Sequence, residues 1–199
     1  MNHPINIRLA GREDIPAIHD IYETYATTTW FNTEEPPLSG EDFIARMVSI
    51  MKRYPCLVAT HQNHVIGYTY ASAFRARPAY DWTAELSIYI RHDWAGRRLG
   101  KVLYRTLIEI LKRQGICNLY ALVICGNKSS ELLHDATGFD YLTTYDRVAY
   151  KKGKWLSVIV FYRRIGLLKT PPEPICPISG MDIEELALIL KEANHTLNI

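Results

Sequence analysis

A single carboxylate stands in a stretch of the chain that otherwise reads as a buried strand. The segment Ala84–Ile90 alternates between apolar and polar residues, as a strand with two different faces does. Its polar face carries Glu85, Ser87 and Tyr89. A central strand with a purely structural role would be apolar on both faces. Glu85 is therefore a candidate general base, because a carboxylate whose pKa is raised by burial accepts a proton from a reacting group.

A glycine-containing turn follows this strand and leads into a helix predicted over about Gly100–Lys112. The first turn of a helix leaves backbone N–H groups unpaired and carries the positive end of the helix dipole, which suits a diphosphate. Taken alone, such a turn is more often the plain start of a helix. Beside the acid, it predicts a site where an activated, phosphate-bearing cofactor meets a small polar acceptor. The candidate cofactor-binding residues here are Gly96, Arg97, Arg98, Leu99, Gly100 and Lys101.

The composition is that of one globular domain with an appendage. The chain has 199 residues, of which 48% are apolar and 22% charged, and its net charge is +2. The basic residues form no tract, so we expect no nucleic-acid partner. No apolar run approaches the length of a membrane span, and the N-terminal Met1–Pro4 lacks the pattern of an export signal. We therefore expect no membrane partner and a cytoplasmic location.

The four cysteines predict reduced thiols rather than a metal site. Cys56, Cys117, Cys125 and Cys176 show no C-x-x-C spacing and no histidine at ligand spacing. Thiols of this kind usually fill space in a core or a loop. We expect no metal ion.

Hydrophobic periodicity and turn residues predict strands and helices along most of the chain. After Gly166 a cluster of prolines marks a change of character. We therefore expect a main domain over residues 1–166 and a tail over residues 167–199 that ends in an amphipathic helix. The predicted strands are Asn6–Ala10, Cys56–Thr60, Val65–Ala73, Ala84–Ile90, Asn118–Ile124, Tyr141–Tyr150 and Trp155–Arg163, and the helices between them include Gly100–Lys112 and Ser129–Thr137.

Several short motifs follow one another along the chain: Ile7–Ala10, Thr29–Phe31, Gly67–Ala71, Arg75–Arg77, Ala79–Glu85, Ile88–Ile90, Asn127 with Ser130, Leu133–Phe139, and Gly153–Trp155 with Val158. In this order they resemble the GCN5-related N-acetyltransferase (GNAT) superfamily and, within it, the phosphinothricin N-acetyltransferase group. The resemblance implies an α+β fold, with a mixed, mostly antiparallel twisted sheet, splayed fourth and fifth strands, and helices on both faces. It also implies direct acetyl transfer from acetyl-CoA to an amine, without a covalent enzyme intermediate.

The resemblance also implies how the cofactor is held. The arm of acetyl-CoA would bond to the backbone of the fourth strand at Ile88, Tyr89 and Ile90, and its diphosphate would rest on the turn before the third helix. Asn127 and Ser130 match positions that hydrogen-bond the arm of CoA. A turn and a helix cap would use the same two residues, and that structural role is compatible with binding.

The diphosphate turn departs from the family pattern at two positions. Ala95 stands where the family has Gln or Arg, and Arg98 stands where it has a glycine. The side chain of Arg98 would either hinder the close approach of a diphosphate or add a charge-assisted contact to it.

Two residues carry the implied chemistry. Glu85 matches the family's catalytic glutamate and would take the proton of the acceptor amine, which is mostly charged at neutral pH. His134 occupies the position where many relatives have a tyrosine that protonates the leaving thiolate. An imidazole can do the same or share the base role with Glu85, although a lone histidine in a helix is more often structural.

The resemblance further implies a pocket for an acceptor with two anionic ends, such as an amino acid that carries a phosphinate or sulfone-like group. A guanidinium fork and aromatic walls suit such a molecule. Arg77 and Tyr80 match the family positions best, whereas Arg75 could equally be solvated. The candidate substrate-binding residues are Phe31, Tyr70, Arg75, Arg77, Tyr80 and Val158.

Three alternatives stay open from the sequence. The enzyme could use another amine, such as a peptide N-terminus, an aminoglycoside or a polyamine, although the charge of Arg77 disfavours a polycation. The departures at Ala95 and Arg98 would also fit a non-catalytic module that binds acyl-CoA. The final helix reads more often as a local cap on the domain, and a homodimer contact is the alternative.

Overall fold

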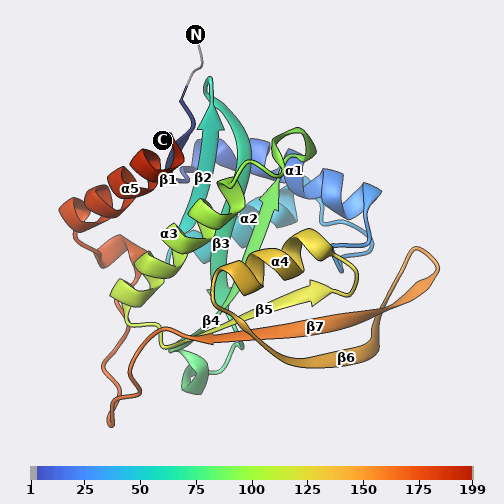
Figure 1. The fold of residues 1–199 in the computed structure, drawn as a ribbon. Coiled ribbons are helices and arrows are strands. Elements are labelled where there is room, and N and C mark those ends of the chain that lie inside the picture. The colour runs from blue at the N-terminus through green and yellow to red at the C-terminus, as the bar shows by residue number, and fades with distance from the viewer. Residues whose placement is uncertain (1–3, 199) are drawn as a thin grey trace.

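The chain builds one seven-stranded sheet in the order β1-β2-β3-β4-β5-β7-β6 (Figure 1). The computed structural model describes residues 4–198. Neighbouring strands run antiparallel except for β4 and β5, which are parallel. The predicted mixed, mostly antiparallel sheet is therefore confirmed. The strands are β1 Asn6–Leu9, β2 Cys56–His61, β3 His64–Ala73, β4 Thr83–Ile90, β5 Asn118–Ile124, β6 Asp140–Lys151 and β7 Lys154–Arg164.

Five α-helices accompany the sheet within the described residues: α1 Ile15–Thr28, α2 Gly40–Met51, α3 Leu99–Gln114, α4 Lys128–Ala136 and α5 Ile183–Leu197. Polar side chains cap three of those starts. Ser39 Oγ accepts from the Asp42 amide at 3.1 Å before α2, and Asn127 Oδ1 accepts from the Ser130 amide at 3.3 Å before α4. Before α5, Asp182 Oδ1 accepts from the Glu184 amide at 2.7 Å. Gly115 ends α3 with a φ of +90°, a conformation that glycine adopts without strain. The capping residues thus decide where α2, α3 and α4 begin or end.

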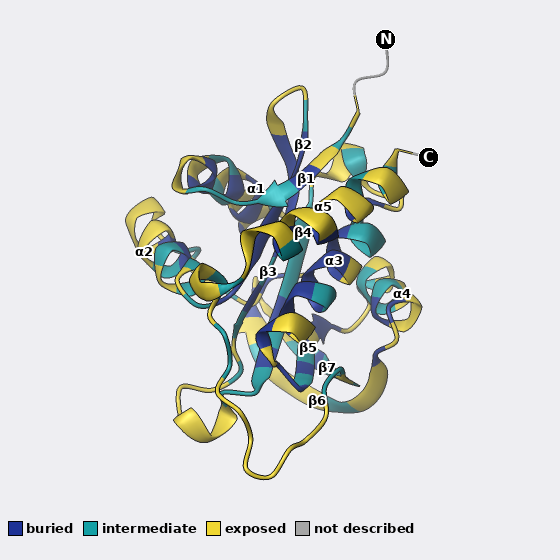
Figure 2. Ribbon diagram, turned by 90° about the vertical axis from the view of Figure 1, so that its left-hand side faces the viewer, coloured by how far each residue is buried: buried dark blue, intermediate teal, exposed yellow. Residues whose placement is uncertain are grey.

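The alternation of side chains along the strands separates two apolar cores, one on each face of the sheet. On β2, Leu57 and Ala59 join the core under α3 and α5, whereas Cys56 and Val58 join the core under α1 and α2. Buried residues follow the sheet between these helix layers when the molecule is turned by 90° (Figure 2). Helices therefore cover both faces of the sheet in the region from β1 to β5, as expected.

Strands β4 and β5 pair over only three positions. Thr83, Ala84 and Glu85 stand opposite Asn118, Leu119 and Tyr120, and the pairing ends there. The other edges of both strands stay paired, because β4 pairs with β3 as far as Ile90 and β5 pairs with β7 as far as Ile124. The predicted splay of the fourth and fifth strands is thus present and begins directly after Glu85.

Helix α5 covers the outer edge of the sheet. The side-chain amide of Asn194 accepts from the Ile7 amide at 2.6 Å and donates to the Ile7 carbonyl at 2.9 Å. One turn further on, Asn198 repeats this exchange with Ile5. Leu186, Ile189 and Ala193 of α5 belong to the same apolar core as α3. The division of the chain at residue 166 stays a prediction.

Of the helices in residues 4–198, none combines the length and apolar character that a membrane span requires. Residues 1–3, which carry part of the expectation about export, lie outside the described residues.

Candidate active site

A narrow cleft opens between β4 and β5 where their pairing stops. Its cavity has a volume of about 70 Å³. Leu86 to Tyr89 of β4 form one wall and Ala121 to Ile124 of β5 the other. Each of these strands lacks a strand partner on this side, so an extended ligand can bond to backbone groups that face the cleft. The remaining lining residues are Tyr25, Phe31, Tyr104, Asn127, Ser130 and His134.

The cleft continues into a wider groove of about 490 Å³ at the starts of α3 and α4. Ile88, Asn127 and Ser130 line both spaces, so the two form one continuous path. The amides of Leu99 and Gly100 precede the first hydrogen bonds of α3, which Lys101 and Val102 donate to the Arg98 carbonyl. An elongated ligand with an anionic middle section therefore fits this path, with its charge at the start of α3.

Nearly all predicted cofactor-binding residues lie along this path. Tyr89 lines the cleft only, and Arg97 lies outside the lining, with its guanidinium 4.6 Å from the centre of the Trp94 ring. Those that line the wider groove are Ile88, Ile90, Gly96, Arg98, Leu99, Gly100, Lys101, Asn127 and Ser130.

Two positions of the turn are constrained by space and conformation. Arg98 has a φ of +60°, in the left-handed region that favours glycine, so it keeps the expected turn at the cost of strain. A Cβ on Gly100 would lie 3.1 Å from Cδ1 of Ile90, so that glycine allows the first turn of α3 to approach β4 closely. Arg98 therefore adopts a backbone conformation typical of glycine, and it lines the groove.

Glu85 lies at the narrow end of the cleft, at the last position where β4 pairs with β5. Burial raises the pKa of Glu85 above its ordinary value of 4.5, and the charge of Arg75 partly lowers it again. The carboxylate also raises the pKa of Tyr104, which lines the cleft, although burial contributes more to that shift. Glu85 is thus a more basic carboxylate than a solvated one, close to the cleft.

His134 is buried, with 2% of its surface exposed, and lines the cleft. Its Nδ1 lies 2.7 Å from the Ser130 carbonyl, which can only accept, so Nδ1 carries the proton. Its Nε2 therefore accepts from the Tyr104 hydroxyl at 2.9 Å. Burial lowers the pKa of His134 to about 4, so the ring is neutral at pH 7 and orients Tyr104.

Tyr104 is a cleft residue that the sequence reasoning missed. The side chain is fully buried on α3, and its ring belongs to the apolar core. In the sequence it therefore resembles any other core residue of this helix. Its position four residues after Gly100 places it on the helix face toward the site. A buried tyrosine usually needs a partner for its hydroxyl, and that requirement could have drawn attention to it.

Two of the predicted substrate-binding residues, Tyr70 and Val158, lie on the face of the sheet that carries Glu85. Tyr70 stands opposite Ser87, and Tyr120 stands opposite Glu85. Val158 stands opposite Ile124, which is on the Tyr120 face of β5. Phe31 lines both the cleft and the groove. The structure thus brings Tyr70 and Val158 to one side of the sheet.

The predicted arginines and Tyr80 lie in the exposed connection before β4. Arg75 donates to the Phe74 carbonyl at 2.7 Å, and its guanidinium lies 4.1 Å from the centre of the Phe74 ring. The Phe74 ring in turn lies 5.9 Å from that of Tyr80 and stacks 4.4 Å from that of Tyr120. Arg77 is exposed at the start of a short turn of helix that contains Tyr80. This connection forms an aromatic and basic surface beside Glu85.

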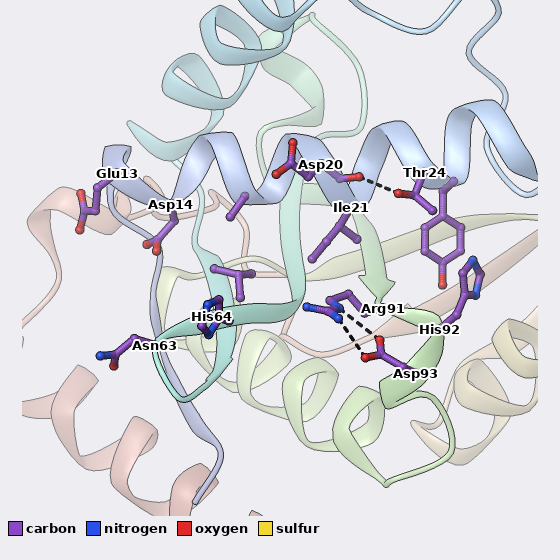
Figure 3. A pocket seen from close by; sticks show the side chains of 13 residues that line it. Glu13, Asp14, Asp20, Ile21, Thr24, Asn63, His64, Arg91, His92 and Asp93 are labelled. Atoms are coloured by element: carbon purple, nitrogen blue, oxygen red, sulfur yellow. Dashed lines mark hydrogen bonds and ion pairs between the residues drawn. The ribbon is translucent and has the colours of Figure 1, made fainter. Parts of the chain in front are cut away.

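A further cavity, of about 630 Å³, is lined by residues of α1, of the turn between β2 and β3 and of the segment after β4 (Figure 3). Tyr25 and His92 line both this cavity and the cofactor groove. Its charged groups are largely paired, because Arg91 bonds to Asp93 at 2.9 Å and Arg8 holds Asp14 at 2.6 Å. The Tyr25 hydroxyl donates to the Ile90 carbonyl at 2.7 Å and so steadies the end of β4. The lining of this cavity includes none of the residues predicted from the sequence. Among residues 4–198, no three His, Cys, Asp or Glu side chains gather as metal ligands would.

The family model for the acetyltransferase (GNAT) domain matches residues 7–160, and the chain belongs to this family. The phosphinothricin N-acetyltransferase of Streptomyces viridochromogenes is 34% identical over 176 residues, which cover 88% of this chain and 96% of that protein. The L-methionine sulfoximine/L-methionine sulfone acetyltransferase of Pseudomonas paraeruginosa is 31% identical and covers 84% of this chain and 98% of its own. The predicted superfamily and group are confirmed.

A solved structure gives the same result for the fold. The phosphinothricin acetyltransferase from Sinorhizobium meliloti, in complex with acetyl-CoA, matches with a TM-score of 0.79 and 32% identity, over 85% of this chain and 92% of that one. The expectations of an acyltransferase and of acetyl-CoA as its co-substrate are confirmed. The groove fits that molecule, since it offers helix N–H groups, Arg98 and Lys101 to a diphosphate and a strand edge to an extended arm.

Arg98→Gly and Arg98→Ala separate the charge at this position from its strain. Both variants lose the guanidinium, and we expect KM for acetyl-CoA to rise about five-fold in each, since one exposed charge contact contributes about 1 kcal/mol. Only glycine relieves the positive φ, so Arg98→Gly should be more stable than Arg98→Ala by about 1 kcal/mol. Steady-state kinetics and urea unfolding measure the two effects. An unchanged KM would exclude the contact, and equal stabilities would exclude the strain.

Proposed function

We propose that the enzyme transfers the acetyl group of acetyl-CoA to the amine of a small amino-acid-like compound of the phosphinothricin or methionine sulfoximine type. The observation that carries this proposal is the place of Glu85, a basic carboxylate at the narrow end of the cleft, beside an aromatic and arginine-bearing surface. The names of the relatives support it, because they describe amino acids with a phosphinate, sulfoximine or sulfone group.

The two ends of such a substrate meet different groups of the chain. Its amine would lie toward Glu85, and its anionic or strongly polar end toward Arg77, with Arg75 nearby. Tyr70, Tyr80, Phe31 and Val158 would supply the walls around the carbon chain. Because Arg77 is exposed and adds positive charge, it disfavours a polyamine or an aminoglycoside as the acceptor.

Glu85 and the edge of β4 perform the first part of the reaction. Acetyl-CoA, when bound, supplies an acetyl group activated as a thioester, whose C–S bond breaks as the N–C bond to the amine forms. Glu85 takes the proton that the amine loses, directly or through a water. Backbone N–H donation near Ile88–Ile90, where β4 lacks its β5 partner, stabilises the negative charge that develops on the carbonyl oxygen.

Tyr104 and His134 perform the second part. The Tyr104 hydroxyl gives a proton to the departing sulfur, and the proton held by Glu85 then restores Tyr104. The raised pKa of Tyr104, caused by burial and by Glu85, keeps the hydroxyl protonated until the sulfur leaves. His134 Nε2 holds this hydroxyl at the wall of the cleft. His134 thus assists through Tyr104, since a neutral imidazole has no proton on that nitrogen.

We also propose a homodimer and a cytoplasmic location. Four free thiols suit a reducing compartment. Large exposed apolar side chains gather on β6, β7 and the adjoining part of β5, which supports a contact there. Sedimentation equilibrium should give a dimer that Trp155→Glu converts to monomers, and a monomeric wild-type protein would contradict the proposal. The exposed residues are Leu122, Tyr141, Leu142, Tyr145, Val148, Tyr150 and Trp155.

The pH dependence of kcat/KM tests the role of Glu85. The protonated acid cannot accept a proton, so the rate should fall as the pH drops through the raised pKa of Glu85. Arg75 lowers that pKa, so Arg75→Gln should move this acid limb to higher pH. Glu85→Gln should remove the limb and lower kcat at least about 100-fold. A wild-type kcat in Glu85→Gln at every pH would remove Glu85 from the mechanism.

An acceptor screen tests the substrate class. We expect turnover with phosphinothricin, methionine sulfoximine and methionine sulfone, detected as free thiol released from acetyl-CoA. Aminoglycosides, polyamines and peptides with a free N-terminus form the comparison set. Fastest turnover in that set would favour the alternative amines, and tight acetyl-CoA binding by calorimetry without any turnover would favour a non-catalytic module.

Tyr104→Phe keeps the buried ring and removes only the hydroxyl. We expect kcat to fall about 100-fold, because a proton donor in the transition state is lost. His134→Ala should also lower kcat, but it should add little in the Tyr104→Phe background, since both act through one hydroxyl. Single-turnover and steady-state rates of the two single variants and the double variant measure this. A full additional effect of His134→Ala in the double variant would show that the two residues act separately.

A further inference from the structure

Lys151 is an almost fully buried lysine, with 1% of its surface exposed, at the turn end of the β6–β7 hairpin. Lysine is rarely buried to this extent unless its ammonium has a defined partner. Here Nζ donates to the backbone carbonyl of Asn32 at 2.8 Å, across 119 positions of sequence. Burial lowers the pKa of Lys151, and the carboxylates of Glu35 and Glu34 partly raise it again.

Neighbouring residues of the hairpin turn contact the same loop, residues 29–35 between α1 and α2, which we name the acceptor loop. The amide of Lys152 donates to a carboxylate oxygen of Glu35 at 2.7 Å. The ammonium of Lys154 lies 4.8 Å from the centre of the Trp30 ring. The hairpin therefore holds the acceptor loop at several points, of which Lys151 is the buried one.

The acceptor loop reaches the active site through two adjacent residues. The ring of Phe31 lines both the cleft and the cofactor groove. The side chain of Asn32, which is 5% exposed, donates to the Tyr89 hydroxyl at 3.3 Å and accepts from the Glu34 amide at 2.7 Å. Tyr89 is on the polar face of β4 that also carries Glu85. A bond to the backbone of Asn32 thus fixes both Phe31 and the contact to Tyr89.

We propose that Lys151 is a positioning residue that sets the affinity for the acceptor by holding the acceptor loop against the cleft. This inference rests on the proposed acetyl transfer to an amine. The hydrogen bond from Lys151 to the Asn32 carbonyl orders a short loop before the acceptor binds, so that binding does not have to order it. The cofactor groove is built mainly from the starts of α3 and α4 and depends on the loop only through Phe31.

Lys151→Met tests this, because methionine fills a similar space without the donor. With an acceptor identified by the screen, we expect its KM to rise about ten-fold, with KM for acetyl-CoA within about two-fold of the wild-type value. Lys169→Met is the matched control, because this exposed lysine pairs with Glu173 in the tail, and its loss should leave the acceptor KM within about two-fold. An unchanged acceptor KM in Lys151→Met, or an equal rise for both substrates, would overturn the proposal.

Amide hydrogen exchange gives a readout that does not depend on turnover. Peptides that contain residues 29–35 should exchange faster in Lys151→Met than in the wild type, whereas peptides of α3 and β2 should not change. Unchanged exchange in the loop would overturn the proposal even if KM rises. Faster exchange without turnover on any amine would instead show that the loop is held as described and that the proposed function fails.

Asn32→Ala supplies a second variant in case Lys151→Met does not fold. It keeps the backbone carbonyl but removes the contact to Tyr89, so the acceptor KM should rise in the same direction. In the double variant the two effects should not add, because both act through one loop. Full additivity, or a wild-type acceptor KM in Asn32→Ala, would overturn the proposal that Lys151 acts on the cleft through the acceptor loop.

Discussion

The loss of hydrogen bonding between β4 and β5 after Glu85 is the constraint on which the site depends. A backbone donor or acceptor that is removed from water without a partner costs free energy, so a gap inside a sheet must be small, wet or filled by a ligand. Both strands remain tied on their other edges, to β3 and to β7, and this keeps the gap open. The cleft is therefore formed by the backbone pairing of the sheet, and the side chains determine only its lining.

Burial affects the pKa values of Glu85 and His134, two titratable groups near the cleft, in opposite directions. Burial raises the pKa of Glu85 and lowers that of His134, because in both cases the charged form loses solvation. A more basic carboxylate suits proton removal from an amine. A neutral imidazole, with its Nδ1 proton given to the Ser130 carbonyl, suits the fixed orientation of the Tyr104 hydroxyl. Burial, a single cause, thus suits Glu85 to accept a proton and suits His134 to orient the Tyr104 hydroxyl as a donor.

Local patterns predicted much of this arrangement, and the remainder depends on contacts between distant parts of the chain. Alternation along Ala84–Ile90 and the glycines of the following turn correctly predicted that Glu85 lies on a strand and that a helix begins near Gly100. Tyr104 was missed because its polar atom meets His134 only after α3 and α4 pack together. Lys151 was missed for a similar reason, since a lysine in a hairpin turn is normally solvated and its partner lies in the loop after α1. The positive φ of Arg98 could not be read from a sequence that departs from glycine there.

Asn194 of α5 and Asn198 at its C-terminal cap affect how the sheet forms during translation. Asn194 and Asn198 present their amides to Ile7 and Ile5 much as an eighth strand would, and they occupy groups on which a foreign strand could otherwise dock. During translation β1 emerges first, whereas its amide cover emerges almost two hundred residues later, at Asn194 and Asn198. Until then the edge of β1 has unpaired backbone groups. During this interval the chain is most exposed to strand-swapped association with neighbouring chains.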